Sequence, residues 1–164
     1  MLQRIQTVYL LLAFACTSAL LFFPIFIIKS SYEGIETEIV FDAYGLNTSG
    51  STEGQFPLYI LFIILAVLTF FGVLLFKNRK KQLLIVRLSF IFHLLTALAF
   101  LLFALFGKQV LTHKIIEMGD KDINIDFSYG IGYYLLFISI PFLLLAIKGI
   151  KADEQLVKSL DRIR

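Results

Sequence analysis

The sequence predicts an all-α membrane protein, in which four antiparallel helices cross the bilayer and a small β-containing cap covers their outer ends. Two observations support this fold class. Hydrophobic residues make up 59% of the 164 residues and charged residues 16%, whereas soluble domains have about 45–50% and about 25%. Four stretches of 20 to 24 residues also lack Asp, Glu, Lys and Arg, namely Ile5–Ile28, Gly54–Phe76, Leu88–Gly107 and Phe127–Ile147. This composition excludes a soluble enzyme, a disordered chain and a nucleic-acid-binding module.

The length of these stretches matches a bilayer. A helix rises about 1.5 Å per residue, so about 20 residues cross a hydrocarbon core of roughly 30 Å. We therefore predict one membrane domain over 1–164 with helical spans at about 5–28, 57–76, 84–107 and 128–148. The expected connections are outer loops 29–56 and 108–127, an inner hairpin 77–82 and a cytoplasmic C-terminal helix 149–164.

The first span needs to be distinguished from a signal peptide, because Arg4 is followed directly by an apolar run. Its apolar region exceeds the 7–15 residues that are usual in signal peptides. We expect it to be retained as a membrane anchor. Cys16, the lone cysteine, lies within it, and a small buried apolar role is expected for this side chain.

Charge asymmetry predicts the orientation, because Lys and Arg concentrate on cytoplasmic loops. The two termini and the hairpin, together with Arg87 and Lys148 at the adjoining ends of the spans, hold 11 of the 15 basic residues, whereas the two other loops hold nine of the twelve acidic residues. Both termini are therefore expected to face the cytoplasm. The basic side is expected to contact the anionic headgroups of the lipid bilayer and not nucleic acid.

The two outer loops show strand-like alternation. Apolar and acidic residues alternate within Ile35–Tyr44, and two similar runs, His113–Glu117 and Ile123–Phe127, suggest a hairpin in the second loop. The apolar residues of its second run would share one face, namely Ile123, Ile125 and Phe127. The two loops are expected to pair into a small antiparallel sheet, with two irregular acidic loops as the alternative.

The inner hairpin and the C-terminal segment define the cytoplasmic end. A connection as short as Lys77–Gln82 makes the second and third spans antiparallel neighbours. The hairpin is interpreted mainly as a topology determinant. In the segment 149–164, Leu156, Leu160 and Ile163 follow a helical spacing. Three roles remain open for this helix: a straight extension of the fourth span, a helix lying on the inner headgroups, or a docking surface for a partner.

Polar side chains within the spans are candidates for function because they are costly in lipid. His93 shares a helix face with Ser89 and Thr96. We interpret it as a structural hydrogen-bonding residue, with a ligand or proton-transfer role as the alternative. The sequence contains no nucleophile–base pair or metal-ligand cluster. We therefore predict a protein that is not an enzyme, with no catalytic residue and no cofactor or metal site.

Small and helix-breaking residues indicate where helices approach or bend. Gly130 and Gly132 open the fourth span, and Thr17 and Thr69 lie within the first and second. Small residues of this kind allow close contact between helices in membranes. Pro141 is expected to bend the fourth span.

Three stretches of the chain carry a family resemblance. The start MLQRIQTVYLLLA, the central FGVLLFKNRKKQ and the ending KADEQLVKSLDRIR resemble the bacterial family known as domain of unknown function 4293. The resemblance covers the whole chain. It implies a bacterial inner-membrane protein with four spans, and it implies no activity, ligand or catalytic residue.

The leading hypothesis for function is a non-catalytic accessory or scaffold subunit that contacts another integral membrane protein or a second copy of itself. Charged residues near the cytoplasmic ends would contact lipid headgroups or partner groups, namely Arg4, Lys77, Arg79, Lys80, Asp153, Glu154, Asp161 and Arg162. One alternative is a small oligomeric transporter or channel with a polar track through Ser89, His93, Thr96 and Ser139. Another is a haem- or quinone-binding redox subunit.

Overall fold

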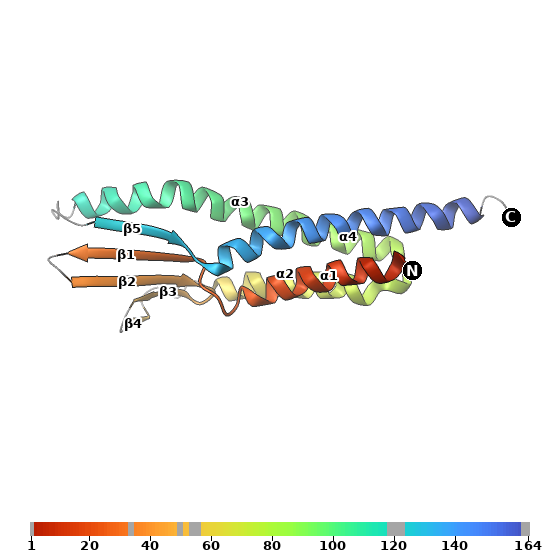
Figure 1. Cartoon of the computed structure of the whole chain (residues 1–164), viewed down its shortest axis with the longest axis horizontal. Coiled ribbons are helices and arrows are strands. Elements are labelled where there is room, and N and C mark those ends of the chain that lie inside the picture. Colours follow the sequence, from red (N-terminus) through yellow and green to blue (C-terminus); the bar gives the residue numbers. More distant parts are fainter. Residues whose placement is uncertain (1, 33–34, 49–50, 53–56, 118–123, 162–164) are drawn as a thin grey trace.

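The computed structural model describes residues 2–32, 35–48, 51–52, 57–117 and 124–161. Within these residues the protein is mostly helical, with a bundle of helices at one end and a small sheet at the other (Figure 1). The helices are α1 (Leu2–Ala19), α2 (Leu58–Leu74), α3 (Arg79–Glu117) and α4 (Ile131–Asp161). Helices α1 and α3 each pack against both α2 and α4, and consecutive helices run in opposite directions (Figure 1). This confirms the predicted antiparallel arrangement of four helices.

Among the described residues, three helices are long and apolar enough to cross a membrane, over the segments Leu58–Lys77, Arg79–Gly107 and Ile131–Gln155. The corresponding apolar segment of α1 is shorter and covers Ile5–Ala19. At about 1.5 Å per residue, the 18 residues of α1 measure roughly 27 Å. A crossing by the first helix therefore stays a prediction.

The first helix ends nine residues before the predicted end of its span, so the predicted helical segment 5–28 is wrong in its last third. After Ala19 the chain turns, and Pro24, which has no backbone N–H, precedes β1 (Phe26–Tyr32). The backbone N–H of Ile25 donates to the carbonyl of Phe41 at 2.8 Å. The apolar residues at the end of the stretch therefore form a strand in place of further helical turns.

The sheet joins the two outer loops, as predicted. Its other strands are β2 (Ile35–Asp42), β3 (Gly45–Thr48), β4 (Ser51–Thr52) and β5 (Asn124–Tyr129). The strand order is β4-β3-β2-β1-β5, and each neighbouring pair is antiparallel. Phe26 pairs with Phe41 on one side and with Tyr129 on the other. A strand from the second loop thus completes a sheet made mostly by the first.

The predicted hairpin within the second loop is wrong. His113–Glu117 continues α3 as a helix, and β5 pairs with β1 and not with this segment. Ile123 lies outside the described residues, whereas Ile125 and Phe127 belong to β5. Extending an existing helix adds a hydrogen bond for each residue ordered, without a new nucleation step, and this favours helix after Gly107.

The inner hairpin is tighter than the predicted 77–82. A short 3₁₀ turn, η1 (Leu75–Lys77), follows α2, and only Asn78 separates it from α3. The Asn78 side-chain oxygen accepts from the backbone N–H of Lys81 at 3.3 Å, which caps the first turn of α3. Residues 79–83, expected before the third span, are therefore already helical.

The fourth helix runs without a break from Ile131 through Pro141 to Asp161. The C-terminal segment, as far as it is described, is therefore a straight continuation of the fourth span, which was the first of its three predicted roles. Figure 1 shows this end of α4 projecting beyond the start of α1, away from the sheet.

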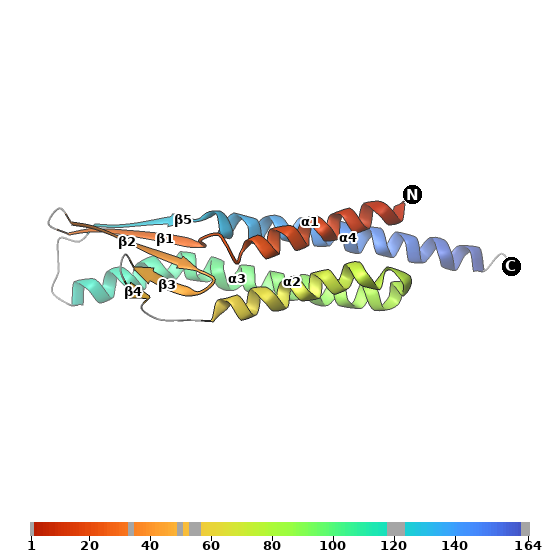
Figure 2. The ribbon, with the colours of Figure 1, turned by 90° about the horizontal axis from the view of Figure 1, so that it is seen from below.

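Two hydrophobic clusters form the core. At the sheet end, Phe26 is fully buried and lies against Phe41, Phe100 and Phe103, so that one face of the sheet packs on α3 (Figure 2). The second cluster lies toward the hairpin and joins α1, α3 and α4 through fully buried residues, among them Leu10, Val86, Leu143 and Ile150.

The junction between strands and helices depends on glycine. The backbone N–H groups of Gly130 and Gly132 donate to the carbonyls of Ile25 and Pro24, at 2.9 and 2.8 Å. A Cβ atom on Gly130 would lie 2.2 Å from the Pro24 oxygen. The predicted close approach is therefore present, although the partner is the turn after α1 and not the shaft of a helix.

Candidate functional site

Polar residues inside the apolar helices form a buried chain of hydrogen bonds. His93 is fully buried on α3, and its Nε2 lies 2.9 Å from the hydroxyl of Thr17 on α1. Its Nδ1 lies 2.8 Å from the backbone carbonyl oxygen of Ser89, one turn earlier in α3. Both ring nitrogens are therefore within hydrogen-bond distance of protein groups.

The chain continues from α3 to α2. The Ser89 hydroxyl lies 2.9 Å from that of Thr69, which in turn lies 2.8 Å from the carbonyl of Leu65. Because Thr69 uses its proton toward Leu65, Ser89 is the donor between the two hydroxyls. Side chains from α1, α2 and α3 are thus joined through polar contacts in the interior of the bundle.

Sequence reasoning identified only part of this group. Ser89 and His93 come together as predicted, whereas the Thr96 hydroxyl donates to the carbonyl of Phe92 in its own helix, at 2.8 Å. Ser139 is buried and likewise donates to its own helix, at the Leu136 carbonyl. Thr17 and Thr69 were expected as small packing residues, and the structure gives them the additional role of hydrogen-bonding partners between helices.

The geometry of this group suits the joining of helices. Each hydroxyl and ring nitrogen in the chain from Thr17 to Thr69 has a partner within the bundle. Among the residues that the structure describes, no three His, Cys, Asp or Glu side chains gather where they could hold a metal ion. The residues Thr17, His93, Ser89 and Thr69 are called the interior polar chain below.

The second group lies at the hairpin. Arg79 donates from its guanidinium to the carboxylate of Asp153, and their nitrogen and oxygen atoms are 2.7 Å apart. The Asp153 side chain is only 7% exposed and that of Arg79 is 28% exposed. Two of the residues predicted to contact lipid or a partner therefore form an ion pair with each other, which joins the start of α3 to α4.

The other predicted contact residues differ in what surrounds them. Lys77 and Lys80 are exposed, and Glu154 is partly buried and has an interaction partner within the chain. Arg4 lies in α1 and Asp161 in α4, whereas Arg162 lies outside the described residues. A role of these residues in binding lipid or a partner stays a prediction.

Two glutamines near the hairpin were not anticipated. The side-chain amide of Gln82 donates to the carbonyl of Gly72 at 2.9 Å, which ties α3 to α2. Gln6 is buried in α1 against Gly149 of α4, and its Nε2 has no hydrogen-bond partner among the described residues. The signal that could have revealed them is their position, because each lies near the end of an otherwise apolar helix segment.

A comparison with protein families decides what kind of chain this is. Residues 2–163 match the family described as domain of unknown function DUF4293. The chain belongs to the DUF4293 family. Among curated proteins, no sequence matches it at a significant level. The matched residues of the DUF4293 chain include the interior polar chain and the hairpin with its ion pair.

The fold brings the three stretches that resemble the family to one end of the DUF4293 chain. The first is the start of α1, the second is the turn between α2 and α3, and the third is the end of α4. Figure 1 shows these segments together at the end opposite the sheet. They are far apart in sequence, so their proximity is a property of the fold.

Proposed function

We propose that the DUF4293 chain is a four-pass protein of the bacterial inner membrane with both termini in the cytoplasm. Support comes from the arrangement of its ends, since the start of α1, the end of α4 and the basic hairpin lie opposite the sheet (Figure 1). An even number of crossings puts the two termini on one side. The acidic loops lie at the sheet end, which is the distribution expected for loops outside the cytoplasm.

Within this topology we propose a non-catalytic role as an accessory or scaffold subunit that contacts another integral membrane protein. The main support is the structure of the hairpin end. There the Arg79–Asp153 ion pair joins α3 to α4, and the Gln82–Gly72 hydrogen bond joins α3 to α2. This leaves exposed cations on a fixed frame, among them Lys77, Lys80 and Lys81. Such a preorganised charged surface suits recognition of acidic groups on a partner, because little side-chain and backbone freedom is lost on binding.

The interior polar chain agrees with this role. Its hydroxyl and imidazole groups are used between helices of the same chain. The outward faces of the helices are apolar, with exposed residues such as Ile63, Val67, Leu95 and Leu98. These faces suit either lipid or the apolar flank of a neighbouring membrane protein.

Site-specific photo-crosslinking in native membranes tests the proposal. A photoreactive phenylalanine at Lys77, in the exposed hairpin, is expected to yield a defined adduct with another membrane protein. The matched control carries the same group at Tyr44, which is exposed at the sheet end. The mass of each adduct distinguishes a different protein from a second copy of the chain.

Two results would contradict the scaffold proposal. One is the absence of any crosslinked adduct from position Lys77 in cells grown under several conditions. The other is equal labelling from both positions with many unrelated proteins, because this would indicate contact by collision. An adduct of two identical chains would show that the partner is a second copy of the chain and not a different protein.

A further inference from the structure

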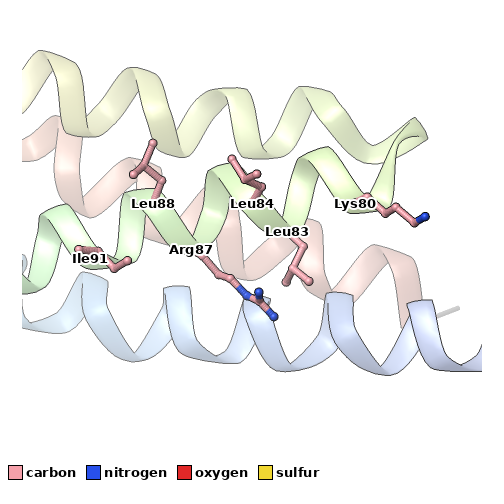
Figure 3. Close-up of a pocket in the computed structure, with 6 residues that line it drawn as sticks. All are labelled: Lys80, Leu83, Leu84, Arg87, Leu88 and Ile91. Atoms are coloured by element: carbon pink, nitrogen blue, oxygen red, sulfur yellow. The ribbon is translucent and has the colours of Figure 1, made fainter.

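An open groove of about 340 Å³ lies on the outer face of α3, just after the hairpin (Figure 3). It combines four apolar side chains with two basic ones, and its lining residues are Lys80, Leu83, Leu84, Arg87, Leu88 and Ile91. In Figure 3, Lys80 points toward the hairpin end, whereas Arg87 points toward α4.

The charges of this groove have one sign. Lys80 and Arg87 are seven residues apart, which is about two helical turns, so they lie on the same side of α3, roughly 10 Å apart along its axis. Both are exposed, and none of the six lining residues is acidic. The neighbouring Arg79 differs, because its guanidinium is already paired with Asp153. The groove therefore favours an anionic ligand.

The groove also requires an apolar ligand. Leu84 and Ile91 are 64% and 53% exposed, and together with Leu88 they form an apolar path deeper along α3. Arg87 lies inside the membrane-spanning segment Arg79–Gly107, at a depth where a long basic side chain extends toward the headgroup level. A ligand that fits both features has a negative charge at the hairpin end and a hydrocarbon chain toward the bilayer centre.

We propose that this groove binds an anionic phospholipid of the leaflet next to the hairpin. The phosphate lies between Arg87 and Lys80, at the level of Leu84, and one acyl chain follows Leu88 and Ile91. A guanidinium can hold two phosphate oxygens at once, which gives Arg87 the larger share of recognition. The site rests on insertion of the DUF4293 chain in a membrane and is independent of any protein partner.

Titration of the detergent-solubilised full chain with phosphatidylglycerol, followed by native mass spectrometry, measures this binding. Arg87→Gln is expected to weaken it roughly fivefold, because one cation at an anionic lipid contributes on the order of 1 kcal/mol. Lys80→Gln tests the second cation and is expected to act in the same direction. Lys81→Gln is the matched control, since Lys81 is exposed in the same turn but does not line the groove.

The outcomes distinguish specific lipid binding in the groove from non-specific electrostatic attraction and from the scaffold role. Wild-type affinity in both Arg87→Gln and Lys80→Gln, or an equal loss in Lys81→Gln, would overturn it. Binding of phosphatidylcholine as tight as phosphatidylglycerol, or displacement of the lipid by millimolar inorganic phosphate, would also overturn it. Circular dichroism confirms that each variant is folded. Because the assay contains no other protein, its result does not depend on the crosslinking experiment.

Discussion

At the residue scale, the proton positions in the interior polar chain follow from counting donors. The Ser89 carbonyl can only accept, so Nδ1 of His93 carries a proton and donates to it. The Thr17 hydroxyl has a single proton and two acceptors within reach, namely the Ala13 carbonyl at 2.7 Å and, in the neutral Nδ1–H ring, Nε2 of His93 at 2.9 Å. His93 thus joins α1 to α3 through Nε2 and the Thr17 hydroxyl, whereas its Nδ1–H donates within α3.

Removal of the Thr17 hydroxyl is expected to weaken this joint. Thr17→Val keeps the side-chain volume and takes away the hydroxyl that is hydrogen-bonded to His93, so the unfolding free energy should fall by about 1 kcal/mol. Thr96→Val is the matched control, because that buried hydroxyl donates only within its own helix. SDS-titrated unfolding in mixed micelles, followed by circular dichroism, measures both. Equal losses of unfolding free energy for the two variants would show that the contact of Thr17 with His93 does not stabilise the bundle.

Gly130 is the second position where one side chain decides the outcome. A methyl group there would overlap the Pro24 carbonyl, which is backbone and cannot rotate away. Gly130→Ala is therefore expected to lower the unfolding free energy by about 2 kcal/mol or more. At Gly107 the nearest side-chain atom would be 3.5 Å from the new Cβ, so Gly107→Ala should be neutral or stabilising. The same unfolding assay checks both, and a tolerated Gly130→Ala would show that the junction is not closely packed.

At the element scale, the two ends of the helical bundle are held by different kinds of contact. The hairpin end uses an ion pair and the Gln82 side chain, whereas the sheet end uses the aromatic residues around Phe26. The Asp153 carboxylate is the most buried charge in this arrangement and so depends most on its partner.

Disruption of the ion pair is expected to loosen α4 from the hairpin. Arg79→Gln leaves the buried Asp153 carboxylate without its cation and should cost about 2 kcal/mol of unfolding free energy. Asp153→Asn in the Arg79→Gln background should recover part of this loss, because no buried charge then remains. Lys151→Gln, which changes an exposed cation on α4, is the control. Additive effects in the double-mutant cycle would show that the two side chains act independently.

At the scale of the whole molecule, the bundle separates two chemically different ends. One end holds the start of α1, the end of α4 and the tight basic hairpin. The other end holds a five-stranded sheet, and its strands come from the segment between α1 and α2 and from the segment between α3 and α4. Helix α3 connects them, since its 39 residues are longer than a bilayer crossing needs and its last part runs beside the sheet (Figure 2).

Cysteine accessibility in intact cells tests the proposed topology. After Cys16 is replaced by Ala, a cysteine at Tyr44 should react with a membrane-impermeant maleimide from outside. A cysteine at Lys81 should react only once the inner membrane is permeabilised, since the positive-inside distribution puts the hairpin in the cytoplasm. Both positions are exposed, so reactivity reports the side of the membrane. The reverse pattern would invert the topology and would falsify the cytoplasmic placement of both termini.

The sequence by itself determined the helical bundle, its antiparallel order and the existence of a sheet across the two outer loops. Long uncharged stretches and period-two alternation are local patterns. They depend only on residues that are neighbours in the sequence, so they can be recognised without knowledge of the fold. The tertiary structure decided where these patterns stop. Phe26 and Ile28 look like the end of a span, but they become a strand because β2 and β5 are available to pair with them. Partners for Thr17, Asp153 and Gln82 likewise come from other helices, and a contact between distant segments depends on packing that no single stretch encodes.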